Sequence, residues 1–451
     1  MKIKDIATLV TTSVDPRNHP NIYWNLYSLP SFDDNRTCEV VLGSEIQSNK
    51  FVVPSKCILF NKLNVRFKRI WRVISQEANN ICSTEFLPLV IDETKADYDY
   101  MYYLLRSDFI TTYLTGQHNN TSNSHNRIDI DDFMNIEISL PSISEQKHLA
   151  KVVLDIDNQI DNLTAINRNL EQLARQLYDY WFVQFDFPNQ EGKPYKSSGG
   201  EMVWNEPLKR YIPVGWKECF ISDVETDIVT GKTPSTSDET NFGEDIPFVT
   251  IDDIRGHYFV FEASRNLSLK GADGQSSKYL PKGSLFCSCI GTPGVIGFAG
   301  TKVQTNQQIN SIRFKQNSNA VFLYYGIKLY FSYANAKVGN ILPNMSKGEF
   351  EKILIVYPGE TIIRKFDGLI SPVFNEIEIN SQSIISLNKM RDELLPMLLN
   401  GQVNCDLSHY HIYFQFLFPA DVPQYTGKKL YICAIGTIKQ RERLHERTNN
   451  P

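Results

Sequence analysis

The chain has 451 residues, of which 42% are hydrophobic and 22% charged, and its formal net charge is −5. This length leaves room for two or more domains, and the composition is that of a folded globular protein rather than a disordered or fibrous one. No apolar run reaches the ~18 residues of a membrane span, the N-terminus has no signal-peptide core, and the eight cysteines form no CxxC pair, so the sequence predicts a cytoplasmic protein without a disulfide framework.

Residues 1–140 are predicted to form a first, mainly β domain with a helix near its end. The apolar runs CEVVLG, FVVP, CILFNKL and IWRVISQ are separated by turn-forming residues, which is typical of short strands. The later run YDYMYYLLRSDFITTYL is predicted to be helical.

A basic window in this first domain predicts contact with a polyanion. No Asp or Glu occurs from Ile46 to Gln76, although the chain as a whole is acidic. Within it, NKLNVRFKRIW brings together basic, amide and aromatic side chains, a mixture that suits phosphates and base edges. The candidate DNA-binding residues are Lys62, Asn64, Arg66, Lys68, Arg69 and Trp71. The alternative is a basic strand edge that only keeps the domain soluble.

Residues 141–182 are predicted to form a long helix of the coiled-coil type. One ladder repeats every seven residues: Leu149, Ile156, Leu163, Leu170 and Leu177. A second ladder, interrupted by Gln159, consists of Val152, Ile166 and Leu173. Such a pattern over about five heptads predicts a partner helix along the whole length.

Residues 183–215 are predicted to be a central linker, and residues 216–358 a second, mainly β domain. Its strand-like runs are IPFVTIDDI, YFVFEA, SLFCSCI, GVIGFAG and INSIRFK, and Tyr324 to Ala336 is predicted to be a helix.

The second domain also contains an acid-free window, from Gly274 to Gly348. Two sets of candidate DNA-binding residues are predicted in this domain. The first is a turn whose amides could meet a phosphate: Gly231, Lys232 and Thr233. The second offers hydrogen-bonding side chains of the kind that read adenine: Thr305, Asn306, Gln307 and Gln308. The alternative is a buried turn whose polar groups are satisfied internally.

Residues 359–403 are predicted to form a second long helix. One apolar ladder consists of Ile363, Ile370, Ile377 and Ile384. A second ladder beside it consists of Phe366, Val373, Leu387 and Leu394. Asn380 is a polar break, and Pro372 is predicted to kink the helix or split off its first turns. Residues 404–451 form an atypical tail without a counterpart in the first half, predicted to be poorly ordered.

The two halves of the chain repeat each other. The two helices align without a gap at an offset of 217, beginning with Pro141 and Pro358, and MKIKDIATL resembles ECFISDVET. The chain is therefore predicted to be a tandem duplication of one long unit. Short solenoid repeats are excluded because their period is much shorter than this offset. The predicted fold is therefore α+β: two mainly β domains joined by two long antiparallel coiled-coil helices, with a pseudo-twofold internal repeat. Packing of each helix on its own domain alone is the alternative.

Sequence motifs for catalysis are missing. No (D/N)PP(Y/F) run and no GxGxxG after a strand occurs, GTPGVIG lacks the Lys-Ser/Thr of a P-loop, and the histidines do not cluster at metal-ligand spacing. No catalytic, metal-binding or cofactor-binding residue is therefore predicted. Two alternative classes stay open: an enzyme with an unrecognised site, and a structural coiled-coil interaction protein without DNA binding.

Several stretches carry a family resemblance. The run LEQLARQLYDYWFVQFDFPNQEGKPYKSSGGEMVWNEPLKRYIPVGW, together with SLPSISEQKHLA and MRDELLPMLLNGQV, resembles the conserved regions of specificity subunits of type I restriction-modification systems. VTGKTPSTSDETNFGEDIPFVTIDDI, LPKGSLFCSCIGTPG and QTNQQIN are similar to one class of the family's target-recognition domains, and SKCILFNKLNVRFKRIWRV to another. The resemblance covers residues 1 to about 404.

This resemblance implies a non-catalytic subunit that reads double-stranded DNA. Each target-recognition domain would read one half of an asymmetric bipartite site and so direct adenine methylation. Two modification (methyltransferase) subunits would dock along the paired helices, and two motor-nuclease restriction subunits would add cleavage where present. S-adenosylmethionine and ATP with Mg²⁺ would be held by those partner subunits, with no cofactor in this chain and no contact with a membrane.

Overall fold

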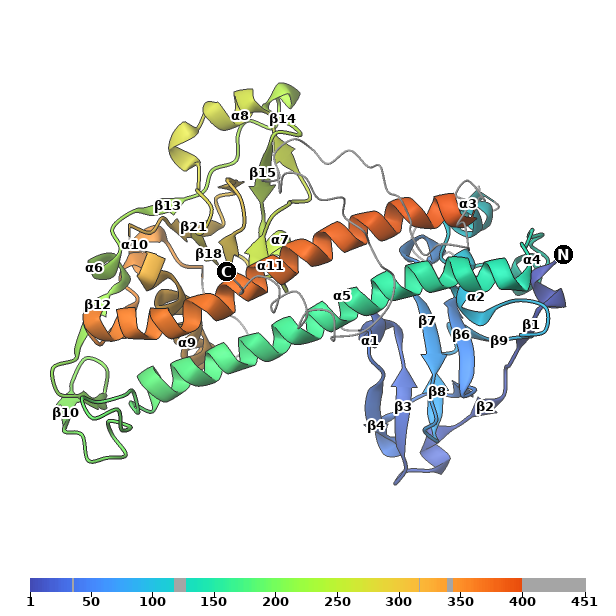
Figure 1. The fold of residues 1–451 in the computed structure, drawn as a ribbon, viewed down its shortest axis with the longest axis horizontal. Coiled ribbons are helices and arrows are strands. Elements are labelled where there is room, and N and C mark those ends of the chain that lie inside the picture. Colours follow the sequence, from blue (N-terminus) through green and yellow to red (C-terminus); the bar gives the residue numbers. More distant parts are fainter. Residues whose placement is uncertain (35, 117–126, 316, 339–343, 400–451) are drawn as a thin grey trace, which may run out of the picture. The chain divides into compact units, whose positions relative to one another are not determined.

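The computed structural model describes residues 1–34, 36–116, 127–315, 317–338 and 344–399. The chain divides into two compact units (Figure 1): residues 1–159 with the chain from 387 onward, and residues 160–386. The tail predicted at 404–451 lies outside the described residues.

Two antiparallel-rich sheets form the globular part of the first unit. One has the order β1-β9-β6-β7, with bounds Ala7–Leu9, Phe86–Ile91, Lys56–Asn61 and Ile70–Ile74. The other has the order β2-β5-β8-β3-β4, with bounds Ser13–Val14, Lys50–Val52, Asn80–Cys82, Tyr23–Tyr27 and Glu39–Leu42. The helices are α1 (Leu29–Asp34), α2 (Tyr98–Leu105), α3 (Asp108–Gly116) and α4 (Ile130–Met134). The helix predicted over YDYMYYLLRSDFITTYL is thus two helices, because Ser107 turns the chain between them and its Oγ donates to the carbonyl of Leu104.

The described residues of the second unit form four sheets. The largest, β13-β21-β18-β19-β16, has bounds Ile228–Thr230, Ile309–Ile312, Leu285–Ser288, Ile296–Ala299 and Phe259–Val260. The sheet β14-β17-β15-β20 has bounds Phe242–Gly243, Asn266–Leu267, Ile246–Val249 and Gln304–Thr305. The pairs are β10-β11 (Met202–Asn205, Arg210–Pro213) and β12-β22 (Lys217–Phe220, Leu354–Tyr357). The shorter helices are α6 (Ile221–Val224), α7 (Ile251–Ile254), α8 (Leu269–Asp273), α9 (Ala320–Val338) and α10 (Lys347–Glu351).

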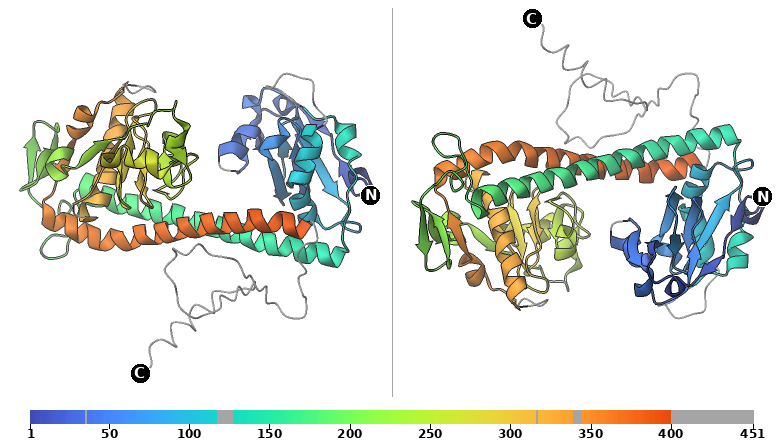
Figure 2. Two further views of the ribbon diagram at one scale, coloured as in Figure 1. Left: turned by 90° about the horizontal axis from the view of Figure 1, so that it is seen from above. Right: turned by 90° about the horizontal axis from the view of Figure 1, so that it is seen from below.

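Helices cover the sheets within each unit. In the first unit α2 packs against β7, and in the second α9 packs against β19 and β22 (Figure 2). The run IPFVTIDDI is a strand only as far as Val249, because Thr250 and Asp253 then cap the single-turn helix α7. The result in each unit is a mainly β core with a helical cover, as predicted.

The internal repeat is visible as repeated hydrogen bonding. Ile3 donates its amide to the carbonyl of Ile136 at 3.2 Å, and Ile221 donates to Ile353 at 3.1 Å. α4 and α10 also begin and end at positions 217 residues apart. The duplication inferred from the sequence is therefore confirmed in the backbone geometry of each unit.

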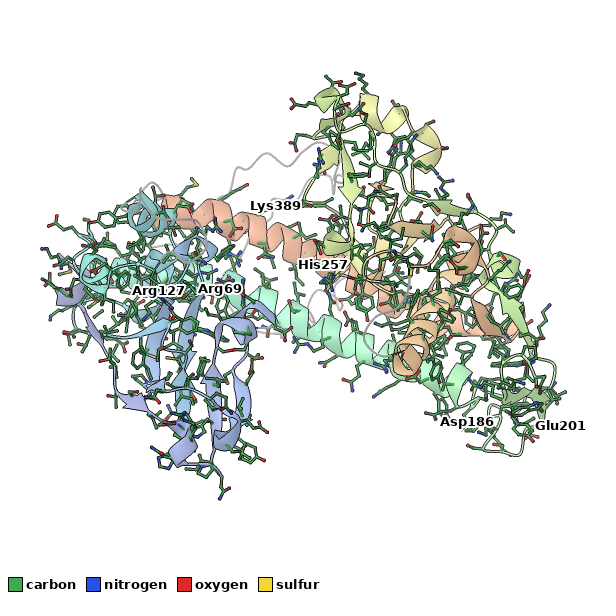
Figure 3. The ribbon with its side chains drawn as sticks, turned by 180° about the vertical axis from the view of Figure 1, so that it is seen from behind. Arg69, Arg127, Asp186, Glu201, His257 and Lys389 are labelled. Carbon is green, nitrogen blue, oxygen red and sulfur yellow. The ribbon has the colours of Figure 1, made fainter. Side chains whose placement is uncertain are left out.

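The segment 183–215, predicted as a linker, contains a small folded motif. Asp186 accepts hydrogen bonds from the amide and hydroxyl of Ser197 at 2.7 and 2.6 Å, and the hairpin β10-β11 follows. The Tyr195 hydroxyl donates to the carbonyl of Glu201 at 2.9 Å (Figure 3 labels Asp186 and Glu201). Phe187 stacks on both Tyr195 and Trp216, so this motif joins the hydrophobic core of the second unit.

The two long helices are α5 (Ile143–Tyr178) and α11 (Glu360–Leu399). In the first unit, Arg391 of α11 donates to Asp157 of α5 at 3.1 Å. In the second, Asn380 of α11 donates to Asn167 of α5 at 2.9 Å. The residue numbers change in opposite directions along the two helices, which confirms the predicted antiparallel pair (Figure 1).

The buried seam differs from the predicted one on α5. On α11, Ile363, Ile370 and Ile377 are buried as predicted. On α5, however, Ile166 and Leu173 are 45% and 52% exposed, so the second predicted ladder is wrong. Of the first predicted ladder, Ile156 is buried and the four leucines are half-buried. The buried positions on α5 are Gln146, Ala150, Val153, Ile156, Asn167, Ala174 and Tyr178. The apolar pattern alone pointed to the larger aliphatic side chains, whereas several buried positions hold small or amide residues.

The polar positions of the seam also differ from the expected ones. Gln159 is exposed, and the partner of Asn380 is Asn167, whose Nδ2 lies 3.3 Å from the hydroxyl of Ser381. A buried amide pair specifies one register, since any slip leaves both amides without partners.

Pro372 does not split off the first turns of α11, because the helix runs unbroken from Glu360 to Leu399, so this part of the prediction is wrong. A proline removes one backbone hydrogen bond and crowds the carbonyl four residues earlier, here that of Gly368. Gly368 and Pro372 are both exposed, and no neighbouring atom lies within 4 Å of a Cβ built on Gly368. Water can therefore solvate the freed carbonyl, and the helix continues.

Replacing Asn380 with alanine is expected to lower the free energy of unfolding by about 1–3 kcal/mol, because the Asn167 carbonyl oxygen stays buried without its donor. Asn169→Ala, an exposed asparagine on α5, is the control and should change stability by less than about 0.5 kcal/mol. Urea denaturation of both variants measures the difference. Equal midpoints for the two would contradict a structural role of the amide pair.

Candidate nucleic-acid interface

The basic stretch of the first unit lies in the connection between β6 and β7. A single 3-10 turn, Val65–Phe67, is flanked by Asn64 and Lys68, whose φ values of 51° and 48° are left-handed. Such angles are uncommon for residues other than glycine and carry strain. The turn exposes Arg66 and leaves Phe67 52% exposed.

Two guanidinium groups lie against this exposed ring. The Cζ atoms of Arg66 and Arg69 are 4.8 and 4.7 Å from the centre of the Phe67 ring. The exposed aromatic residue of the stretch is therefore Phe67, which is not among the predicted contact residues. The sequence feature that points to it is its place between basic residues.

Trp71 is a correction to the candidate set. Its side chain is 7% exposed and makes edge-to-face contacts with Tyr27 and Phe32 at 5.1 and 5.2 Å. Period-two alternation on β7 turns Trp71 toward the core, where it packs with Leu59 and Val73. The indole is thus a core group and does not present a face to DNA.

The basic residues of this window are largely paired with acids from distant parts of the chain. Arg69 (Figure 3) makes a two-pronged contact with Asp33 at 2.7 Å for both pairs of atoms, and Lys68 contacts Asp108 at 2.6 Å. Outside the turn, Lys56 pairs with Glu93 and Arg72 with Asp99. The acid-free window in sequence is therefore balanced in space, and among the described residues Arg66 contacts no carboxylate.

Lys62 and Arg127 share one acidic neighbour. Arg127 (Figure 3) donates to both carboxylate oxygens of Glu85, at 3.0 and 2.7 Å. Arg127, with a smaller contribution from Lys62, lowers the pKa of Glu85. Arg127 lies outside the acid-free window, so charge patterning gave no reason to select it.

In the second unit, the two predicted turns pack directly on each other. The amide of Gly231 donates to the carbonyl of Ile309 at 3.0 Å, and that of Lys232 donates to the carbonyl of Thr305 at 2.9 Å. A Cβ at position 231 would collide with the backbone oxygens of Asn306 and Thr305, which explains the glycine. Because the backbone amides of Gly231 and Lys232 already have acceptors, these two are not available to a phosphate, and the predicted contact is untested for the amide of Thr233.

A buried amide network supports the two turns from below. Gln275 donates to the carbonyl of Lys232 and to Oε1 of Gln304, both at 2.8 Å, and Gln304 donates to the carbonyl of Ala272 at 2.9 Å. Thr305 is buried beside them, so its side chain is not accessible to DNA.

The remaining side chains lie at or near the surface. Gln307 is exposed, and its Oε1 accepts a hydrogen bond from the Thr233 hydroxyl at 2.6 Å. Asn306 is bonded to Gln308 at both ends of its side chain: Asn306 Nδ2 donates to Gln308 Oε1, and the backbone amide of Gln308 donates to Asn306 Oδ1, both at 3.0 Å. Lys232 is also exposed. The structure thus brings Lys232, Thr233, Asn306, Gln307 and Gln308 together on one surface.

The basic residues of the second window are also mostly engaged. Lys282 pairs with Glu378 at 2.6 Å, Arg313 with Asp227 at 3.3 Å, and Lys302 lies 3.7 Å from the centre of the Tyr279 ring. In the described part of the chain, no group of three or more His, Cys, Asp or Glu side chains could hold a metal ion. Nor is any described helix long and apolar enough to cross a membrane.

A duplicated chain with a separate polar surface on each half suits a recognition protein with two reading surfaces. The chain matches the family model for the type I restriction modification DNA specificity domain over residues 1–172 and 213–389, and it belongs to this family. It is therefore a specificity subunit of a type I restriction-modification system, which recognises DNA sequence and assembles with other subunits of such a system.

Known relatives agree with this assignment. The chain is 28% identical to the specificity subunit of the type I restriction enzyme HindI from Haemophilus influenzae, over 88% of this chain and 98% of the relative. It is 26% identical to the MjaIX specificity subunit of Methanocaldococcus jannaschii, over 68% of this chain and 69% of that one. The fold is similar to the crystal structure of the S subunit from M. genitalium, with a TM-score of 0.53, 13% identity, and coverage of 88% and 95%.

Proposed function

We propose that each globular part reads one half of an asymmetric bipartite DNA site and thereby directs adenine methylation by a complex in the cytoplasm. One observation carries this proposal: the two halves repeat the long helix and the contacts beside it, but their globular parts present different side chains. The first presents Arg66 and Phe67, and the second presents Thr233, Asn306 and Gln307. Different side chains on the two halves of a repeated chain suit two different sequences.

The methyltransferase and motor activities are proposed to belong to partner subunits. Those subunits, two for modification and two for restriction, would hold S-adenosylmethionine and ATP with Mg²⁺. Support for docking along the helices comes from four exposed apolar side chains of the second unit: Ile166, Leu173, Leu369 and Ile379. Large apolar residues left uncovered on long helices are suited to receive partner helices.

The test is co-expression with the cognate methyltransferase subunit, followed by methylome sequencing. Methylated adenines in one two-part motif with different halves are expected, and the methyltransferase expressed alone is the control. Methylation that is independent of this chain, or a motif without two parts, would contradict the proposal.

Arg66 is the sharpest single test of the first reading surface. Arg66→Ala should weaken DNA binding by the assembled complex and reduce the slope of log affinity against log salt by about one, the value for one lost phosphate contact. Arg17→Ala, an exposed arginine already paired with Asp15, is the control. Binding titrations over a range of salt concentrations measure both slopes, and an unchanged slope for Arg66→Ala would place it away from the DNA.

Membership of the DNA specificity family sets aside the other class that the sequence left open, a structural coiled-coil protein without DNA binding.

A further inference from the structure

The turns at 231–233 and 305–308 are locked together more firmly than ordinary surface loops. Gly231 permits a close backbone approach, two backbone hydrogen bonds join the turns, and Gln275 holds the Lys232 carbonyl from below. A side chain that reads a base must be held in place before binding, by neighbours that fix its rotamer. The exposed amide side chains above these turns meet that condition.

Of the three amide side chains at 306–308, Gln307 is exposed, whereas Asn306 and Gln308 are half-buried. Both ends of the Asn306 side chain are engaged: Nδ2 donates to Oε1 of Gln308, and Oδ1 accepts from the backbone amide of Gln308. The backbone carbonyl of Gln308 accepts from the backbone amide of Cys289 at 2.8 Å. Gln307 is exposed, and its Oε1 accepts the 2.6 Å hydrogen bond from Thr233, the one side-chain hydrogen bond that it makes to the described residues.

The Thr233 hydroxyl holds the side-chain amide of Gln307 in one orientation. In this hydrogen bond the hydroxyl donates to Oε1, so Oε1 faces Thr233. Nε2, with its two hydrogens, then points away from Thr233, and Oε1 keeps one lone pair. This leaves a donor and an acceptor side by side, which complements N7 and the N6 amino group on the major-groove edge of adenine.

We infer that Thr233 is a positioning residue that orients Gln307, and that Gln307 reads an adenine in the half-site of the second globular part. The inference rests on the proposed function, since it concerns the same DNA-reading surface. Beyond the proposed function, the inference names the base that is read (adenine), the side chain that reads it (Gln307) and the residue that positions this side chain (Thr233).

Three variants of the complex, analysed by methylome sequencing, test the inference. Thr233→Val removes the hydroxyl at nearly constant shape and should relax the motif at one A·T position of one half-site, with roughly tenfold or greater loss of discrimination there. Thr233→Ser keeps the hydroxyl and should retain the wild-type motif. Gln307→Glu can only accept hydrogen bonds, so it should shift the preference at that position toward cytosine, whose N4 amino group donates.

Two controls separate this inference from the proposed function. The half-site read by the first globular part should stay unchanged in every variant, and Thr236→Val, an exposed threonine in the same loop, should leave the whole motif intact. If the wild-type chain directs a bipartite motif but Thr233→Val and Gln307→Glu leave it unaltered, the inference is wrong while the proposed function stands. Equal loss of methylation with Thr233→Val and Thr233→Ser would also overturn it, because the hydroxyl would then have no specific role.

Discussion

Phe366→Ala is expected to lower the free energy of unfolding by about 3–5 kcal/mol, the usual cost of removing a buried phenylalanine side chain. Phe366 of α11 is 0% exposed, and its ring centre lies 4.9 Å from Phe182 and 5.7 Å from Trp181. These rings join the long helices to the core of the second unit, so the cavity would open where α11 meets it. Denaturant unfolding followed by tryptophan fluorescence measures the loss, since Trp181 and Trp216 lie in the same core.

Leu369→Ala is the matched control for this experiment. Leu369 lies three residues away on the same helix but is 54% exposed, so its loss should change stability by less than about 0.5 kcal/mol. For assembly with partner subunits the larger effect should come from Leu369→Ala, because Leu369 belongs to the exposed apolar residues proposed to receive those subunits. Similar destabilisation by both substitutions would show that the aromatic cluster is not the main core.

Exchanging residues 1–140 for the corresponding domain of another specificity subunit is expected to replace one half of the methylated motif completely and leave the other half intact. The physical reason is that the reading side chains of each half lie on its own sheets and loops, whereas the helix pair carries the connection. The reciprocal exchange of residues 216–358 is the matched variant and should change the opposite half. Methylome sequencing measures both. A change in both halves after one exchange would contradict independent reading.

The duplication shows how far the sequence leads. The offset of 217 residues, the antiparallel helix pair and most of the strands followed from apolar periodicity and turn residues, which are local properties of the chain. The repeated hydrogen bonds Ile3–Ile136 and Ile221–Ile353 confirm that inference at the level of the backbone. Family membership also followed from stretches that can be read directly.

The candidate site was less predictable, because burial and charge pairing depend on residues far apart in sequence. Trp71 and Phe67 have similar sequence surroundings, yet β7 turns Trp71 into the core and the strained turn exposes Phe67. Asp33 and Asp108 neutralise Arg69 and Lys68 from outside the acid-free window.

The sequence by itself determined that this protein has two similar halves, two long helices and a DNA-reading function, since repeats, heptads and family motifs are encoded locally. Only the tertiary structure decided which face of α5 is buried, that Asn380 pairs with Asn167, and that Thr233 reaches Gln307. The two hydrogen bonds, Asn380–Asn167 and Thr233–Gln307, each join residues more than 70 positions apart. No local pattern specifies such a pair, because the folded backbone alone brings its two members within hydrogen-bonding distance.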